Sequence, residues 1–161
     1  MIILIFLCVT LGIILTFTFI NNKNIQPREK KINQLFQQYH TELNDISEQL
    51  KNMDYELIRW DNTDAQKLIC SKKTVDGGYT QITVEISNSP FFQNIEKMGE
   101  INIVHILKES NYIMFVFWSS LDASCGLIYC QDEKPIIYDR GKTKLNDVSA
   151  PAWYYFTHQG S

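Results

Sequence analysis

The residues of this sequence that could do chemistry centre on one cysteine in its C-terminal part. Cys125 could act as a nucleophile if a histidine lay within hydrogen-bonding distance to accept its proton. His105 and His158 are the candidate bases, and Asp122 and Arg140 are the charged groups that could assist them. Because a catalytic triad is defined by geometry and not by order along the chain, such a site would form only in three dimensions. The chemistry would be that of a cysteine hydrolase.

The segment around this cysteine reads Asp122-Ala123-Ser124-Cys125-Gly126-Leu127-Ile128. It resembles the Asp-Cys-Ser-Gly-Leu-Val signature of a family of cell-wall cysteine peptidases, with the cysteine two positions later in the run. The resemblance would imply Cys125 as the nucleophile and a histidine on a following strand. In that family the cysteine begins a helix, whereas the residues here predict that Cys125 enters a strand. We therefore assign the chain to no family on this ground.

Ligand sets for metals and cofactors are not found in the sequence. The histidines lie far apart, and a zinc site needs several ligands at converging spacings. Cys125 and Cys130 do not form a zinc knuckle, and in one extended strand they would lie roughly 17 Å apart, beyond the reach of a disulfide. Gly-rich phosphate- and dinucleotide-binding patterns are also absent. We expect no metal and no cofactor, and the sequence favours a non-enzymatic protein over an enzyme.

An uncharged run, Ile2–Ile20, precedes all of these residues. At about 1.5 Å of rise per residue it would form a helix of roughly 28 Å, close to the hydrocarbon thickness of a bilayer. A cleaved signal peptide would instead need basic residues before the run, a shorter apolar stretch and small residues at its end. The sequence lacks these features. It therefore predicts a single-pass membrane protein whose contact with lipid is made by Ile2–Ile20, with residues 1–20 as the anchor.

Charge is distributed unevenly after the anchor. Residues 21–31 are net positive and form a predicted basic linker beside the membrane, whereas residues 32–161 are net acidic. The positive-inside rule then favours the cytoplasmic side for the C-terminal domain, and an odd number of cysteines outside the anchor fits a reducing compartment. An acidic body excludes nucleic acid as a partner, because phosphate contacts need a basic surface. Residues 32–161 have the length of one ordinary domain.

The first element of that domain is predicted to be an amphipathic helix over Ile32–Met53. Its apolar residues recur at alternating spacings of four and three: Ile32, Phe36, Tyr39, Leu43, Ile46, Leu50 and Met53. Such a stripe can pack on a sheet of its own domain or form a coiled coil between two chains. We predict packing on the sheet, because Phe36 and Tyr39 are large for a tight dimer seam. A homodimer through Ile32–Met53 is the alternative.

From Tyr55 onward, β-branched and aromatic residues in short runs predict an antiparallel meander of about six to eight strands, so the expected fold class is α+β. The predicted strands are 55–60, 65–73, 79–86, 101–107, 112–119, 126–129, 135–138 and 153–157. Asp76-Gly77-Gly78 predicts a tight hairpin turn, and 126–129 with 135–138 predicts a later hairpin. Residues 91–98 predict a helical turn or a capping loop.

Two strands allow a prediction of burial. Residues 112–118 are apolar on both faces, so they should form a central strand covered by the helix. In 79–86, alternating Thr80, Ile82, Val84 and Ile86 predict one buried and one wet face. The predicted core comprises Phe36, Leu43, Ile46, Phe115, Phe117 and Trp118.

Two functions follow from these features. The first is a membrane-anchored, non-enzymatic binding or accessory protein that contacts an unidentified protein partner at the membrane surface. A short tether favours this, because it raises the effective concentration of partners in the same membrane. The alternative is a membrane-tethered hydrolase with a site formed by Cys125, His105 and His158.

Overall fold

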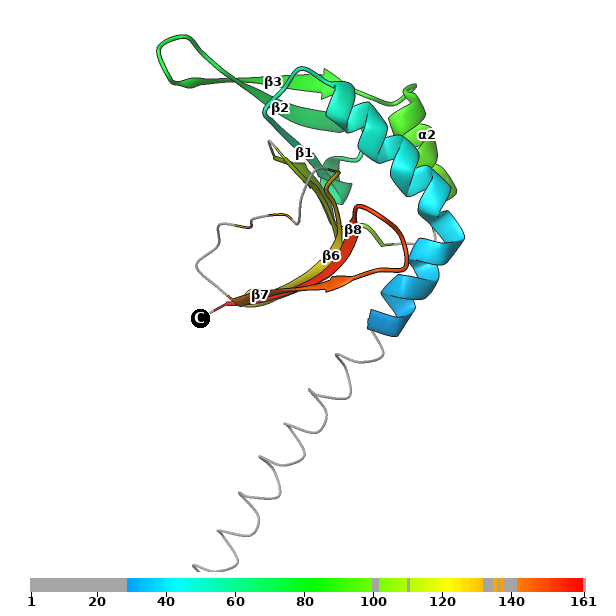
Figure 1. Ribbon diagram of the computed structural model, residues 1–161. Helices are drawn as coiled ribbons and strands as arrows, with labels where there is room; N and C mark the ends of the chain where they lie inside the picture. The colour runs from blue at the N-terminus through cyan, green and yellow to red at the C-terminus, as the bar shows by residue number, and fades with distance from the viewer. Residues whose placement is uncertain are drawn as a thin grey trace, which may run out of the picture. The chain divides into compact units, whose positions relative to one another are not determined.

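The computed structural model describes residues 29–99, 102–109, 111–131, 135, 137 and 142–160. The chain divides into two compact units, residues 1–34 and residues 35–161. Of the first unit, residues 29–34 are described, and they are helical. The second unit contains the continuation of this helix, a short second helix and one sheet (Figure 1).

The predicted anchor, Ile2–Ile20, lies outside the described residues. Within the part of the chain that is described, no helix is both long enough and apolar enough to cross a membrane.

The sheet has eight strands, and every neighbouring pair is antiparallel. The long helix covers residues 29–52, and the remaining elements are β1 Leu57–Asp61, the 3-10 turn η1 Asn62–Asp64, β2 Lys67–Lys73, β3 Tyr79–Glu85, α2 Pro90–Lys97, β4 His105–Lys108, β5 Ile113–Ser119, β6 Ala123–Tyr129, β7 Lys142–Asp147 and β8 Trp153–Gln159. This confirms the predicted α+β class, in which a helix packs on an antiparallel sheet.

The strand order is β3-β2-β1-β4-β5-β6-β8-β7, so the predicted simple meander is wrong at two places. After β3 the chain returns through α2 and places β4 on the other side of β1. At the far edge, β8 lies between β6 and β7. The predicted hairpin of 126–129 with 135–138 is therefore wrong: β6 pairs with β5 and β8, and Pro135 and Ile137 are not in strands. Strand β7 was not predicted.

The helix packs on the sheet through the predicted apolar stripe. Leu43, Ile46 and Leu50 are almost completely buried. The ring of Phe36 lies 5.1 Å from that of Trp153 in β8, and the Trp153 indole N–H donates to the Asn44 side chain at 2.9 Å. This confirms the prediction that the helix packs on the sheet.

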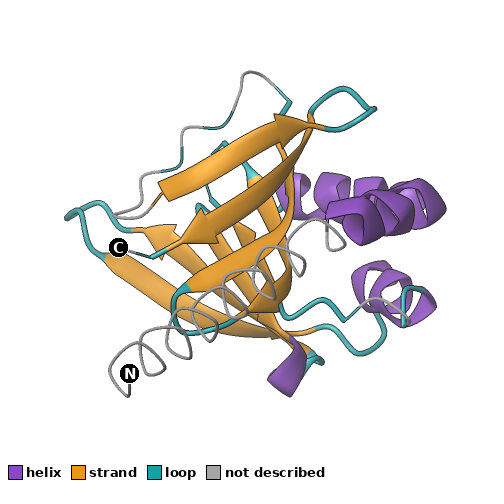
Figure 2. Cartoon of the chain, turned by 90° about the horizontal axis from the view of Figure 1, so that it is seen from below, coloured by secondary structure: helices purple, strands orange, loops and turns teal. Residues whose placement is uncertain are grey.

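Both helices lie on one side of a strongly curved sheet (Figure 2). We call this side the helix face. Trp60 belongs to it because its ring contacts Phe91 of α2. Phe115 also belongs to it because its ring contacts Trp153, which packs against Phe36 of the long helix. We call the other side the opposite face. There, residues within β5, β6 and β8 or directly beside these strands form a second apolar cluster made of Tyr112, Val116, Ile128, Cys130 and Phe156, with Met114, Ile137, Leu145 and Tyr154 packed against it.

The predicted burial holds for the helix but not for all strand residues. Phe36, Leu43, Ile46 and Phe115 are buried as predicted, and β5 is a central strand. Three predictions need correction. Phe117 and Trp118 are only half-buried, because a β-bulge between Val116 and Trp118 interrupts the alternation of β5. The predicted buried face of 79–86 is also wrong within β3, whose residues are exposed except for half-buried Val84, because β3 is the outermost strand.

Candidate protein-contact surface

The sheet holds Cys125 and the two histidines on different sides. In antiparallel pairs, directly opposed residues share a face, and successive residues of a strand alternate between faces. His158 is opposed to Ser124, and His105 is opposed to Val116, which is in turn opposed to Gly126. Val116 belongs to the opposite face, and Ser124 and Gly126 lie on the same side of β6. Both histidines therefore lie on the opposite face.

Cys125 lies between Ser124 and Gly126 on β6, so its side chain belongs to the helix face, where it is buried. The geometry thus does not bring the cysteine together with either histidine. The backbone carbonyl of Asp122 accepts a hydrogen bond from the Gly160 N–H at 2.6 Å, and Arg140 lies outside the described residues.

Each histidine lies close to a different polar side chain. His158 Nδ1 lies 3.1 Å from the Thr143 hydroxyl on β7. His105 Nδ1 lies 2.9 Å from a carboxylate oxygen of Asp61 on β1, without the alignment of a hydrogen bond, so this contact is electrostatic.

Asp61 organises the turn that follows β1. Its carboxylate accepts from the backbone N–H of Thr63 at 3.0 Å and from the Thr63 hydroxyl at 2.7 Å, which caps η1. Burial alone would raise the pKa of Asp61. The two hydrogen bonds from Thr63, with His105 and Arg59 nearby, outweigh that effect and lower the pKa below its ordinary value. The contacts of Asp61 with these residues are therefore explained by the structure of the turn after β1.

The three cysteines outside the predicted anchor are buried thiols. Burial raises the pKa of Cys70, and the nearby Lys108 only partly opposes this. The Cys130 thiol lies 3.0 Å from the carbonyl of Asn111, to which it can donate. No cluster of metal-ligating side chains is present among the described residues.

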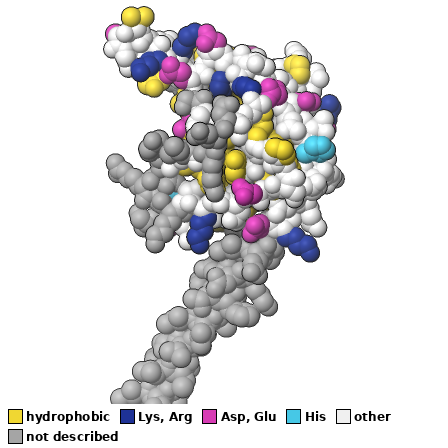
Figure 3. All heavy atoms as spheres, in the orientation of Figure 1, with side chains coloured by type: hydrophobic (Ala, Val, Ile, Leu, Met, Phe, Trp, Pro, Cys, Tyr) yellow, Lys and Arg dark blue, Asp and Glu magenta, His cyan; other side chains and the backbone are white. Residues whose placement is uncertain are grey.

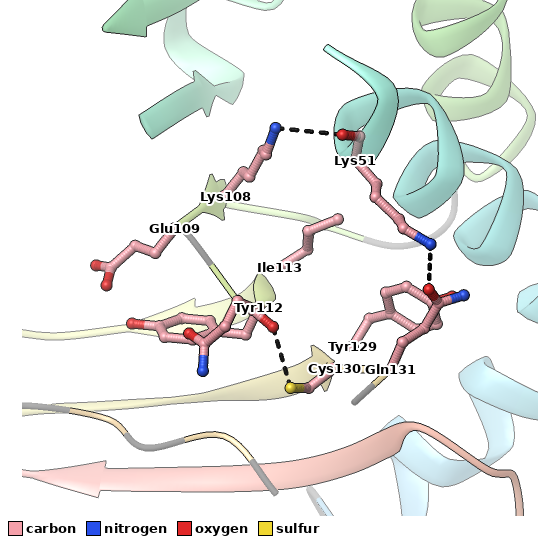
Figure 4. A pocket seen from close by; sticks show the side chains of 9 residues that line it. Lys51, Lys108, Glu109, Tyr112, Ile113, Tyr129, Cys130 and Gln131 are labelled. Atoms are coloured by element: carbon pink, nitrogen blue, oxygen red, sulfur yellow. Dashed lines mark hydrogen bonds between the residues drawn. The ribbon is translucent and has the colours of Figure 1, made fainter. Parts of the chain in front are cut away.

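A small cavity lies where the long helix ends above β4, β5 and β6, and charged side chains line it (Figure 4). Lys108, almost fully buried on β4, donates to the carbonyl of Met53 at 2.7 Å. Lys51 donates to Gln131, and the Tyr129 hydroxyl donates to Glu48 at 2.8 Å. The cavity volume is about 90 Å³, whereas small-molecule sites usually measure about 300 to 1,000 Å³. These side chains join the end of the helix to the sheet and leave little room for a ligand.

A larger hollow of about 350 Å³ lies on the β7–β8 turn, lined by consecutive residues 147–154. The lining comes from the β7–β8 turn and from the ends of the two strands that it joins.

The most unusual surface of the domain lies at the β1–β3 end of the sheet. Among the described residues, the exposed large apolar side chains are Leu57, Ile69, Val75, Tyr79, Ile82 and Leu121, and all but Leu121 belong to β1 or the β2–β3 hairpin. Hydrophobic side chains are visible at the tip of this hairpin in Figure 3. Exposed apolar residues that share one face can mark a contact site, so the face on which each of them lies matters.

The hairpin presents these residues because of its turn and register. Gly77 adopts φ +86°, which glycine tolerates, and the Thr74 hydroxyl donates to Asp76 in the same turn. The register then opposes Tyr79 to Lys73 and continues without a break to the other end of β3. The sequence contained the signal for the hairpin, but not for its position at the edge of the sheet.

Three of the apolar residues share the opposite face. Leu57 is opposed to Ser71, Ile69 to Arg59 and Tyr79 to Lys73. Leu57 and Ile69 are each more than one-third exposed, and Tyr79 is 65% exposed. We call Leu57, Ile69 and Tyr79 the β1–β3 patch.

Comparison of the chain with known protein families, with curated protein sequences and with solved structures finds no match.

Proposed function

We propose that this chain is a membrane-anchored, non-enzymatic binding protein that holds a protein partner at the membrane surface. The observation that carries the proposal is the β1–β3 patch. On the solvent side of an antiparallel sheet polar residues are expected, whereas Leu57, Ile69 and Tyr79 expose apolar surface there. Aromatic and aliphatic side chains of this kind form the centres of protein interfaces.

The surroundings of the patch indicate the chemistry of the partner. Arg59 lies beside Ile69, and Lys73 lies beside Tyr79, in directly opposed cross-strand pairs. An apolar centre with basic neighbours fits a partner that contributes apolar contacts and acidic residues around them.

The uncharged run Ile2–Ile20 and the basic linker 21–31 supply the anchor in this proposal. We infer the cytoplasmic side for the domain from the same basic residues. An anchored domain meets partners of the same membrane at a raised effective concentration, so a small contact patch can be sufficient.

Anchoring is tested by fractionation of membranes that contain the full chain. We expect the protein to stay in the pellet after carbonate treatment and to be released by detergent. A matched variant without residues 2–20 should be recovered in the soluble fraction. Release of the full chain by carbonate, or its recovery without residues 1–21, would contradict the anchor.

Partner binding is tested with a photo-crosslinking amino acid at position 69 or 79 of the full chain in its membrane. We expect both positions to capture the same protein, and Gln93 on the exposed side of α2 serves as the control position. Ile69→Glu should abolish capture from position 79 while preserving the fold, because the new carboxylate would oppose Arg59. Equal capture from position 93, or capture unaffected by Ile69→Glu, would overturn the assignment of the patch.

A further inference from the structure

The outer edge of β3 carries a row of backbone groups directed away from the sheet. At the two ends of the hairpin, the carbonyl of Gly78 accepts from Thr74 at 2.9 Å, and the N–H of Ile86 donates to Gln66 at 2.8 Å. Even-numbered residues of this strand therefore direct their backbone groups toward β2. Because the direction alternates along a strand, Tyr79, Gln81, Thr83 and Glu85 direct theirs outward.

The two edges of the sheet differ in how they are protected against pairing. Edge strands are usually blunted by lysine, by proline or by a bulge. The β7 edge, Lys142–Asp147, has two lysines among its six residues. The β3 edge reads Tyr-Thr-Gln-Ile-Thr-Val-Glu, contains neither lysine nor proline, and pairs with β2 in an unbroken register. Its residues from Tyr79 to Thr83 are all exposed, so among the described residues no side chain buries this part of the edge.

We propose that two copies of this chain associate by antiparallel pairing of β3 with β3, which joins their sheets into one. The sequence of β3 is complementary to itself about Ile82. With Ile82 opposed to Ile82 of the second copy, Gln81 is opposed to Thr83 and Tyr79 to Glu85. In this register the outward backbone groups of each strand meet those of the other, as an antiparallel ladder requires.

The side chains support the same register on both faces. On the helix face, Ile82 is 40% exposed and lies beside buried Cys70, so pairing with its own copy would bury apolar surface. On the opposite face, Lys73, Tyr79 and Glu85 of the second copy would lie in one row across the strands. No like charges are directly opposed, which favours self-association over repulsion.

This self-association uses a different surface from the Ile32–Met53 stripe. Tyr79 belongs both to β3 and to the β1–β3 patch. The pairing of β3 needs neither Leu57, Ile69 nor the anchor, so it can hold or fail separately from the proposed function.

The register makes a specific cross-linking test possible in the full chain, expressed in its membrane with Cys8 replaced by Ser. Thr80 and Val84 of the second copy would be directly opposed in a pair without hydrogen bonds, where side chains are closest. One tagged chain carries Thr80→Cys and a differently tagged chain carries Val84→Cys. We expect mild oxidation to give a disulfide-linked heterodimer when the two are co-expressed. Thr80→Cys alone and Val84→Cys alone should give none, because identical positions are four residues out of register.

A second pair of variants tests the backbone bonds. Thr83→Pro removes a donor that points outward and leaves the β2–β3 bonds in place, so it should abolish the heterodimer. Thr83→Ala retains the donor and should preserve it. Circular dichroism of both variants checks that the domain remains folded. Absence of the cross-link in the co-expressed pair, equal cross-linking in the single-variant controls, or cross-linking unaffected by Thr83→Pro would overturn the proposal.

Discussion

The ammonium group of Lys108 on β4 lies 2.7 Å from the main-chain carbonyl of Met53, just beyond the end of the long helix. It also lies 3.5 Å from the carbonyl of Lys51 in the last turn. The final carbonyls of a helix have no partner within the helix, and positive charge is favourable at that end. Lys108 therefore joins the helix to the sheet. Burial lowers the pKa of Lys108, with Asp54 and Cys70 opposing the change.

Replacing Lys108 by Met should lower the free energy of unfolding by about 1 to 3 kcal/mol, because the carbonyls of Lys51 and Met53 would lose the donor that Lys108 provides. Chemical denaturation monitored by circular dichroism measures the change. Lys144→Met, at an exposed position of β7, is the control and should change stability by less than about 0.5 kcal/mol. Equal effects of the two substitutions would show that Lys108 has no capping role.

Leu43→Ala should cost on the order of 2 to 5 kcal/mol, since Leu43 is fully buried between the helix and the sheet. Gln38→Ala on the exposed side of the same helix should be nearly neutral. The comparison uses the unfolding midpoint of each variant in denaturant. A loss below about 1 kcal/mol for Leu43→Ala would mean that the helix contributes little to the stability of the domain.

Gly126→Ala should be among the most damaging single changes, with a loss of about 4 kcal/mol or failure to fold. A Cβ atom at this position would lie 1.8 Å from the carbonyl oxygen of Phe115, and a backbone atom cannot rotate away. Gly78→Ala is the matched control, because its nearest contact, at 3.2 Å, is the Thr74 hydroxyl, which can move. Soluble yield and thermal unfolding distinguish the two variants. A normally folded Gly126→Ala protein would contradict the packing between β5 and β6.

Asp61 should make the stability of the domain sensitive to acid. Its pKa is lower in the folded state than its ordinary value, so the unfolded state binds the proton more readily. The stabilisation is therefore complete above the unfolded pKa and is lost as the pH falls through the folded pKa. Asp61→Asn keeps the cap of η1 but does not titrate, and it should lose less stability than the parent protein between about pH 5 and pH 3. Denaturant unfolding at several pH values measures this, and parallel pH profiles would show that Asp61 does not contribute.

The sequence by itself determined the features that depend on residues close together along the chain. The stripe that includes Leu43 and Ile46 has the period of a helix, and its apolar side was correctly expected to face a sheet. Asp76 and Gly77 specify the β2–β3 turn, because glycine tolerates the positive φ that the turn requires. The two-sided apolar character of 112–118 identified β5 as a central strand.

Only the tertiary structure decided which strands are neighbours, and with them the surfaces that the domain exposes. The insertion of β8 between β6 and β7 and the position of β3 at the edge depend on hydrogen bonds between residues far apart in the sequence. Alternation along β3 predicted a buried side, but an edge strand has a neighbour on one side only, so Ile82 is exposed. Register likewise decided that Cys125 and His158 lie on different faces, because a shift of one residue reverses the face of every side chain in a strand.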